Sequence, residues 1–157
     1  LPNKKVIITA GADGLVRLWQ TSDGKMVFQI EAHSAPVLAL AVKADGSLLA
    51  TGGADRELKV WDLKTAEKKV AVERFPGNVS AIVWPEKGTD LFTASDDGAV
   101  RTCKEDSKSP TKTWNKAADL LHCLAAAGDG SILYGGSNDG FVYVWDKTGK
   151  ITAKLGI

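Results

Sequence analysis

A nine-residue segment that returns at a fixed spacing is the feature that most constrains how this chain can fold. The segment joins a tight turn at Asp13-Gly14 to an apolar stretch that ends at Trp19. Each copy carries one such aspartate, and these stand 42 residues apart at Asp13, Asp55, Asp97 and Asp139. A constant period of this length indicates a repeat architecture, in which each copy forms one small unit that packs on its neighbours.

Short apolar segments between Gly and Asp turns make up each copy, and this pattern predicts strands rather than helices. An Asp-Gly pair between two alternating segments is a strong hairpin signal, because glycine accepts the positive φ that such turns need. The predicted strands cover residues 6–10, 15–20, 26–30, 37–42, 47–51, 57–63, 69–72, 79–84, 90–93, 99–104, 111–115, 121–126, 131–134, 141–146 and 151–155. Four short antiparallel strands in 42 residues are typical of one β-propeller blade, so we expect an all-β chain of about four blades.

The first copy lacks the segment that would form its first strand. When the copies are aligned, Asn3-Lys4-Lys5 falls opposite Asp45-Gly46-Ser47, the turn that follows the first strand of the second copy. We therefore expect the opening sheet to have three strands and to lack the innermost one. Its inner edge would then carry unpaired backbone groups.

The ends of the third strands resemble the Trp-Asp motif of the WD-repeat β-propeller family. Trp61-Asp62 and Trp145-Asp146 match this motif, Trp19-Gln20 matches it in part, and Cys103-Lys104 departs from it. The resemblance covers almost the whole chain. It implies a single propeller region over residues 1–157, with blades at about 1–32, 33–74, 75–116 and 117–157.

The same resemblance implies a buried chain of hydrogen bonds in each blade, made by a histidine, a serine or threonine, the turn aspartate and the tryptophan. The second copy has all four members, as His33, Thr51, Asp55 and Trp61, which implies a structural rather than a catalytic role for this histidine. The other copies retain part of the set: Thr9, Asp13 and Trp19; Thr93 and Asp97; and Asp139 and Trp145. Since the third copy has Phe75 and Cys103 at the histidine and tryptophan positions, we expect it to be the least rigid.

The resemblance also places candidate contact residues at one rim of the propeller, in loops held by rigid strands, where recognition sites usually lie. Six come from the starts of the innermost strands: Pro36, Leu38, Asn78, Ser80, Leu120 and His122. Four flank the turn aspartates: Ala54, Arg56, Asp96 and Asn138. Taken singly, most of them are also ordinary turn residues, and His122 is equally a solvated imidazole without a partner.

Charge and composition give no support to a nucleic-acid or membrane partner. A formal net charge of +1 over 157 residues creates no general field that attracts DNA or a membrane surface. No apolar run in the sequence approaches the ~18 residues that a membrane-spanning helix needs. Two cysteines are too few for a disulfide framework, and we expect Cys103 and Cys123 to be buried free thiols, with a single disulfide as the alternative. We therefore expect a soluble protein and favour the cytoplasm.

The residues that could perform catalysis or bind a metal do not form a catalytic or metal-binding motif in the sequence. Asp96-Asp97 is an adjacent carboxylate pair, but Asp97 already has the turn position. Asp96, Asn138 and Asp139 offer oxygen ligands for a hard cation, yet they belong to neighbouring blades and lack a dense acidic loop. The Gly-Asp-Gly segment matches no phosphate-binding loop. We expect no enzymatic activity, no cofactor and no metal site.

Four blades are few for a closed ring, because propellers have about four to eight and the WD-repeat family about seven. We expect the exposed end faces to be covered either by the remainder of a longer propeller or by a second copy, which would close an eight-bladed ring. The predicted function is a non-enzymatic scaffold that binds other proteins or peptides at its rim loops. The alternatives are a propeller attached to a larger enzyme or redox protein, and a nucleic-acid-associated subunit, for which Trp114 beside Lys112 and Lys116 is one weak indication.

Overall fold

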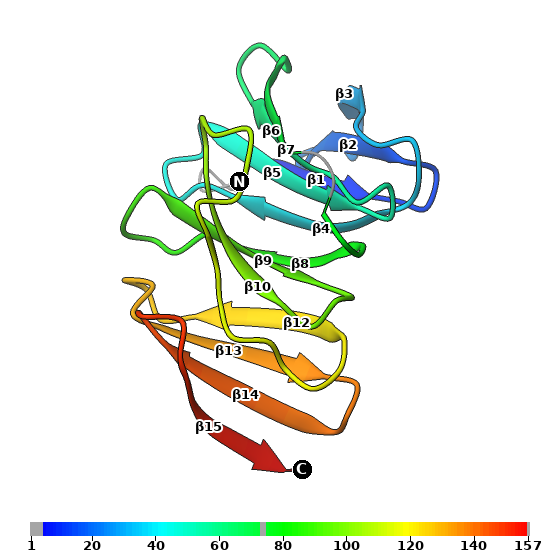
Figure 1. Cartoon of the computed structure of the whole chain (residues 1–157). Coiled ribbons are helices and arrows are strands. Elements are labelled where there is room, and N and C mark those ends of the chain that lie inside the picture. Colours follow the sequence, from blue (N-terminus) through cyan, green and yellow to red (C-terminus); the bar gives the residue numbers. More distant parts are fainter. Residues whose placement is uncertain (1–4, 73–74, 157) are drawn as a thin grey trace.

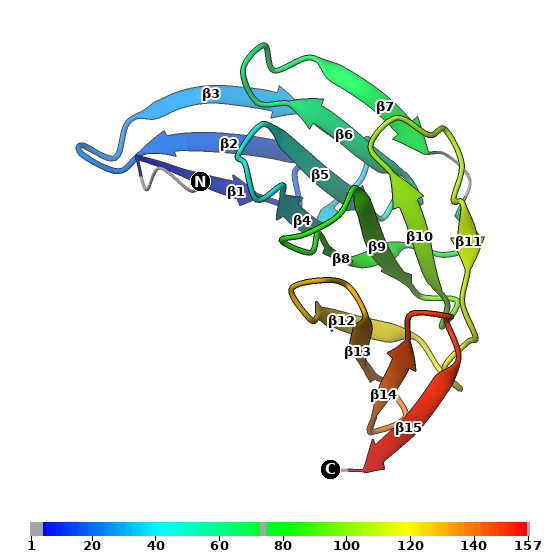
Figure 2. The same ribbon diagram turned by 90° about the vertical axis from the view of Figure 1, so that its left-hand side faces the viewer.

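Alternating apolar residues, interrupted by glycine turns, give the chain four separate antiparallel sheets. The computed structural model describes residues 5–72 and 75–156, and this part of the chain contains strands and turns but no helix. None of the described segments could therefore cross a membrane as a helix. The sheets follow one another in chain order along an open arc (Figures 1 and 2). The predicted all-β fold of about four blades is confirmed.

Three of the sheets have four strands, and the first has three. The first sheet consists of β1 (Val6–Ala10), β2 (Leu15–Gln20) and β3 (Met26–Glu31). The second consists of β4 (Val37–Val42), β5 (Leu48–Gly53), β6 (Leu58–Asp62) and β7 (Lys68–Val72). The third consists of β8 (Val79–Val83), β9 (Asp90–Ser95), β10 (Val100–Lys104) and β11 (Lys112–Thr113), and the fourth of β12 (Leu121–Ala126), β13 (Ile132–Ser137), β14 (Phe141–Asp146) and β15 (Ile151–Gly156). Within the described residues no strand lies inside β1, as predicted for the first copy.

The outer strand of the third sheet is shorter than the predicted segment 111–115. Only Lys112–Thr113 forms β11, although the N–H groups of Thr111 and Trp114 also donate to carbonyl oxygens of β10, at 2.8 and 2.9 Å. The connection before β11 is polar, and Pro110 has no N–H group to donate to a ladder. The third sheet therefore has the weakest outer edge of the three four-stranded sheets.

Each hydrophobic core lies between two successive sheets. Trp61 packs between the first and second sheets, Trp84 between the second and third, and Trp145 between the third and fourth. Burial of apolar surface stabilises a fold by roughly 25 cal/mol per Å². The stacking of sheets is thus the main source of stability, and a sheet without a neighbour leaves one apolar face uncovered.

The strands β4, β8 and β12 lie side by side on the inner side of the arc, whereas β3, β7, β11 and β15 form the outer edges (Figure 2). We call the edge that carries the turns around Asp13, Asp55, Asp97 and Asp139 the rim. We call the opposite edge the base; it carries the turns at 43–47, 85–89 and 127–131 and the connections at 63–67, 105–111 and 147–150. Antiparallel pairing places these two edges at opposite ends of every strand.

The two ends of the arc expose sheet faces whose equivalents in the other sheets are covered by a neighbouring sheet. Leu48 and Ala50 of the second sheet are buried against the third sheet. The residues 84 positions later, Ile132 and Tyr134, lie on the outer face of the fourth sheet and are 38% and 41% exposed. At the other end of the arc, Ile7 of β1 is 54% exposed. Two faces equivalent to the internal junctions are therefore open in this chain.

The cysteines differ in burial because they belong to different faces. Both are free thiols, Cys103 being buried and Cys123 exposed. The prediction was wrong for Cys123, and the alternative of a single disulfide is also excluded. Ala81, which stands 42 residues before Cys123, packs toward the fourth sheet. Cys123 has the same place on the fourth sheet, whose corresponding face has no following sheet.

Candidate functional site

A backbone hydrogen bond that recurs with the 42-residue period fastens the rim turn to the start of the innermost strand in each of the three four-stranded sheets. The N–H groups of Ala54, Asp96 and Asn138 donate, at 2.9, 3.1 and 3.0 Å, to the carbonyl oxygens of Pro36, Asn78 and Leu120. Six of the ten rim candidates thus lie together as three pairs. Because both partners are backbone groups, these bonds do not depend on the side chains of the paired residues.

The rim candidates differ in what they offer to a partner. Six are exposed: Pro36, Leu38, Arg56, Asp96, His122 and Asn138. The half-buried ones are Ala54, Asn78, Ser80 and Leu120. The Ser80 hydroxyl donates to the Leu121 carbonyl oxygen of β12, so it joins two innermost strands and is already engaged.

His122 belongs to a small polar cluster at the rim of the fourth sheet. Its Nε2 atom lies 3.4 Å from the Asn138 Oδ1 atom, and the Asn138 amide donates to the Asp119 carboxylate at 3.0 Å. The Asn138 amide lowers the pKa of Asp119, which keeps this half-buried carboxylate ionised. The cluster combines an imidazole, an amide and a carboxylate that a protein partner could contact.

One rim turn has an arginine where the other three have glycine. Gly14, Gly98 and Gly140 have φ angles of 78°, 76° and 81°, and Arg56 has the same left-handed conformation at 64°. A residue with a Cβ atom is strained in this region by roughly 1–2 kcal/mol. The sequence places an exposed guanidinium at the rim at that energetic cost.

The four members of the hydrogen-bonded chain in the second sheet contact one another in order. Trp61 Nε1 donates to Thr51 Oγ1 at 2.9 Å, and His33 Nε2 lies 2.8 Å from the same hydroxyl. His33 Nδ1 lies 2.8 Å from Asp55 Oδ1. All three contacts are satisfied when the indole donates to the hydroxyl, the hydroxyl to Nε2, and Nδ1–H to the carboxylate. This arrangement requires a neutral imidazole.

The electrostatics of the pair agree with that protonation state. Burial lowers the pKa of His33 from 6.5 and outweighs the opposing effect of the Asp55 carboxylate. Burial raises the pKa of Asp55, but the hydrogen bond from His33 together with the Ser34 N–H group and the Lys59 ammonium outweighs it, so this pKa is also lowered. A neutral imidazole beside a carboxylate is therefore the stable form near neutral pH.

The same pair belongs to a group of side chains that could be mistaken for a metal site. His33, Asp55 and Glu57 offer ligand atoms within 4.8 Å of one another. However, Lys59 Nζ lies 2.8 Å from the Glu57 carboxylate and 3.8 Å from that of Asp55, and both imidazole nitrogens already have partners. The ammonium group of the chain supplies the positive charge there, so the donor set fits an ion-pair network better than a metal.

The other sheets have only parts of the predicted chain, as their sequences allow. In the first, Trp19 Nε1 donates to Thr9 Oγ1 at 2.8 Å. In the third, Cys103 replaces the tryptophan, and the buried Thr93 hydroxyl has no hydrogen-bond partner among the described residues. In the fourth, which has Gly135 at the threonine position, Trp145 Nε1 donates instead to the Asn115 carbonyl oxygen at 2.8 Å.

Each turn aspartate has a partner four residues later that sequence reasoning missed. Arg17 Nη2 lies 2.6 Å from Asp13, Lys59 Nζ lies 3.8 Å from Asp55, Arg101 makes two bonds to Asp97, and the Tyr143 hydroxyl donates to Asp139 at 2.7 Å. The Tyr143 hydroxyl lowers the pKa of Asp139 to about 2. The signal was present in the sequence, since positions 17, 59, 101 and 143 share the 42-residue period and all carry a donor.

A comparison with protein families identifies the repeat. The family model described as "WD domain, G-beta repeat" matches residues 1–20, 24–62 and 108–146, more than half of the chain. The chain belongs to the WD-repeat family. The matched ranges leave out residues 63–107, which hold most of the third WD repeat, where Cys103-Lys104 stands in place of Trp-Asp.

Curated WD-repeat relatives match nearly the whole chain but extend beyond it. It is 30% identical to THO complex subunit 3 of Arabidopsis thaliana, over 90% of this chain and 44% of that protein. It is 30% identical to Target of rapamycin complex subunit wat1 of Schizosaccharomyces pombe, over 92% and 46%. It is 28% identical to Small ribosomal subunit protein RACK1y of Oryza sativa subsp. japonica, over 94% and 46%. The chain thus spans less than half the length of these three relatives.

Proposed function

We propose that this WD-repeat chain is a non-enzymatic scaffold that binds other proteins or peptides at its rim. The recurring backbone bond between the rim turn and the innermost strand of the second, third and fourth sheets carries the proposal. It holds exposed side chains such as Arg56, Asp96 and His122 on a rigid backbone, and contact residues held in this way lose little entropy when they bind.

The partners of the turn aspartates support a structural role for these carboxylates. Each of the four contacts a cation or a hydroxyl four residues later in the chain. A general acid or base must reach a substrate with an available carboxylate. The most obvious acidic groups of the rim are thus engaged in holding the turns.

The names of the relatives support membership of an assembly. Two are named as subunits of the THO complex and of the target of rapamycin complex, and a third as a protein of the small ribosomal subunit. We infer by similarity that this chain also acts as one component of a larger protein assembly. We further propose that its two open end faces are covered in that assembly, by further sheets of a longer propeller or by a second copy.

The rim proposal is tested by capture of partners from cell extract with the whole protein and with two rim variants, Asp96→Lys and His122→Ala. Proteins that copurify with the wild type are quantified by mass spectrometry, and we expect each variant to lose at least about fivefold of the specifically captured partner. Asp106→Lys, a change at an exposed residue of the base, is the matched control. The variants should change the free energy of unfolding by no more than about 0.5 kcal/mol. Equal capture by the rim variants and the control would reject the rim as the binding surface.

A further inference from the structure

Two charged side chains on neighbouring rim turns have no partner in the described part of the chain. Arg56 of the second sheet and Asp96 of the third are both exposed. Neither the guanidinium nor the carboxylate makes a hydrogen bond or an ion pair with a described residue. The other lysines and arginines described at the rim each lie beside a carboxylate; they are Arg17, Lys59, Arg101, Lys116 and Lys154. Arg56 is therefore the cation of the described rim that remains available to a ligand.

One short stretch of chain, just before β8, lies between these two side chains. The Phe75 N–H group donates to the Arg56 carbonyl oxygen at 3.1 Å. At the other end of the stretch, the Asp96 N–H group donates to the Asn78 carbonyl oxygen at 3.1 Å. A Cβ atom at Gly77 would lie 3.1 Å from the Asp96 Cβ atom, so the stretch runs directly against that turn. Since four extended residues span only about 10 Å, one short ligand segment can reach both charges.

An exposed proline, Pro76, belongs to the same stretch of chain. Its ring presents apolar surface and fixes the backbone φ angle, so contact with it costs little conformational entropy. Pro76 lies between the residue bonded to Arg56 and the residue bonded to Asp96. The junction of the second and third sheets thus offers a guanidinium, an apolar ring and a carboxylate side by side at the rim.

The two other junctions of the arc have the same backbone but different side chains. The N–H groups of His33 and Ala117 donate to the carbonyl oxygens of Gly14 and Gly98, at 3.0 and 2.9 Å, as Phe75 does to Arg56. The residues equivalent to Arg56, Pro76 and Asp96 are Gly14, Ser34 and Ala54 at the first junction, and Gly98, Ala118 and Asn138 at the third. None of these six is charged. The middle junction is therefore set apart by its side chains and not by its backbone.

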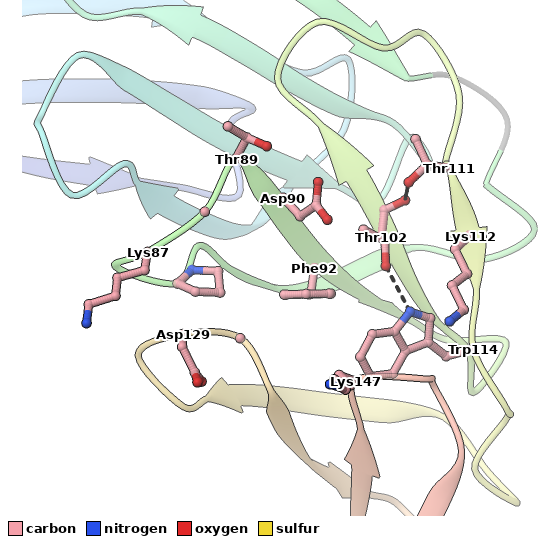
Figure 3. A pocket seen from close by; sticks show the side chains of 13 residues that line it. Lys87, Thr89, Asp90, Phe92, Thr102, Thr111, Lys112, Trp114, Asp129 and Lys147 are labelled. Carbon is pink, nitrogen blue, oxygen red and sulfur yellow. Dashed lines mark hydrogen bonds between the residues drawn. The ribbon is translucent and has the colours of Figure 1, made fainter.

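A cleft of about 550 Å³ at the base is the other place to consider, between the third and fourth sheets (Figure 3). Its aromatic residues, Phe92 and Trp114, are only 6% and 5% exposed and belong to the core between these sheets. The cleft thus offers mainly polar walls, on which lysines and aspartates alternate without a free cation beside an apolar surface. The rim junction has the more selective arrangement of groups.

We propose that the junction formed by Arg56, Pro76 and Asp96 binds an extended segment of a partner protein, in which an acidic and a basic residue flank apolar ones. The partner's carboxylate pairs with the Arg56 guanidinium, whose planar fork suits a carboxylate. The apolar side chains pack on the Pro76 ring, and the basic residue pairs with Asp96. A nucleic acid would bring a row of phosphates toward this carboxylate, which repels them. The inference rests on the rim proposal and names the chemistry of the partner that the rim takes.

The test uses the whole protein and a fluorescein-labelled octapeptide, with binding measured by fluorescence anisotropy. Its central residues are a glutamate, two leucines and a lysine, so that its charges lie about 10 Å apart in an extended chain. Three altered peptides replace both charged residues with glutamate, both with lysine, or both leucines with serine. We expect the wild-type protein to bind each altered peptide at least about fivefold more weakly.

Variants of the protein should change this preference in a defined way. Arg56→Gly puts the residue of the other three turns at this place, so it removes the cation without strain, and we expect about fivefold weaker binding. Asp96→Lys makes both charges positive and should make the peptide with two glutamates the preferred one. Arg56→Glu should make the peptide with two lysines the preferred one. Asp106→Lys, at an exposed carboxylate of the base, is the matched control and should bind like the wild type.

Equal binding of the mixed-charge peptide by the wild type and Arg56→Gly would overturn this inference, and so would variants that keep the wild-type preference. It would also be overturned if a labelled single-stranded RNA of eight nucleotides bound more tightly than the peptide. If the peptide tests fail while His122→Ala still loses partners from cell extract, the rim proposal stands and only its assignment to this junction is wrong. If the rim variants also capture partners normally, both proposals are wrong.

Discussion

Two threonines at equivalent positions show how much one hydroxyl group depends on its neighbours. Thr51 is fully buried and joins His33 to Trp61. Thr93, 42 residues later, is equally buried, but Cys103 and Phe75 stand where its partners would be, and its hydroxyl has none among the described residues. A buried polar group without a hydrogen bond destabilises a fold, whereas a bonded one is roughly neutral or favourable.

Replacing these threonines with valine should therefore have opposite effects. Thr93→Val removes an unbonded hydroxyl with little change of shape, and we expect the free energy of unfolding to rise by about 0.5–1 kcal/mol. Thr51→Val leaves both His33 and Trp61 without their partner and should lower it by about 2–4 kcal/mol. Urea denaturation of the wild type and both variants measures the difference. If Thr93→Val destabilises the protein as much as Thr51→Val, the third sheet has a hydrogen bond that this structure does not show.

The His33 imidazole should make stability depend on pH in a defined window. Its pKa is lowered from 6.5 in the folded state, chiefly by burial. Between these two values the unfolded chain binds a proton that the folded chain does not, so the free energy of unfolding should fall as the pH drops below about 6.5. The slope of one such proton is at most about 1.4 kcal/mol per pH unit. Denaturation midpoints measured from pH 7.5 to 5 should show this fall in the wild type and a shallower one in His33→Asn; equal slopes would assign the effect to other groups.

At the scale of the turn, the residue in the left-handed conformation of each rim hairpin affects the free energy of unfolding through its backbone, whereas its side chain decides what the rim presents to a partner. Arg56 has φ 64°, and Gly140 has φ 81° with nothing within 4 Å of where its Cβ atom would lie. We expect Arg56→Gly to raise the free energy of unfolding by about 0.5–1 kcal/mol, and Gly140→Arg to lower it by a similar amount, because the backbone strain exceeds the extra conformational entropy that glycine loses on folding. Thermal denaturation of both variants measures this. A destabilised Arg56→Gly protein would mean that the guanidinium makes a stabilising contact that outweighs the strain.

The sheets could be predicted from the sequence because turn residues and the repeat period are local signals. The fixed place of Asp13 and its copies located the four rim hairpins, and strand ends moved by only a few residues, most clearly at β11. Burial was harder to predict, since the period of two is the same for both faces of a strand. Cys123 was placed inside for this reason, although its face has no neighbouring sheet.

Features of the structure that no known motif marks were not predicted from the sequence. The donors at Arg17, Lys59, Arg101 and Tyr143 are chemically unlike one another, and only their common distance from an aspartate reveals their shared role. The junction between the third and fourth sheets likewise depends on differences between repeats rather than on a motif, since Phe92 and Trp114 stand where the preceding repeat has Ala50 and Val72. Comparison of repeats within one chain finds such differences, whereas a search for known motifs does not.

At the scale of the whole molecule, the arc is a stack of sheets whose internal junctions are buried and whose ends are open. The fourth sheet exposes Ile132, Tyr134 and Leu155, and the first exposes Ile7. Large apolar groups gathered on one face mark a surface that another protein part covers. Successive sheets of this chain already pack through such faces. The open face of the first sheet in one copy is therefore of the type that would cover the open face of the fourth sheet in another copy.

Expressed by itself, the 157-residue chain should therefore associate through its end faces. We expect native mass spectrometry to show a species of twice 16.6 kDa, in which two arcs close an eight-bladed ring by two identical contacts. Leu155→Glu puts a charge on the outer face of the fourth sheet, where Leu155 is 53% exposed, and should shift the protein to the monomer. Leu38→Glu, at an exposed leucine near the rim of the second sheet, should leave association unchanged. If the wild type instead forms larger, polydisperse species, and Leu155→Glu dissociates them, the end faces still cause association. Ring closure would then be rejected, because the two faces would meet at an angle that does not close a ring. A wild-type monomer that stays in solution would contradict the role given to both faces.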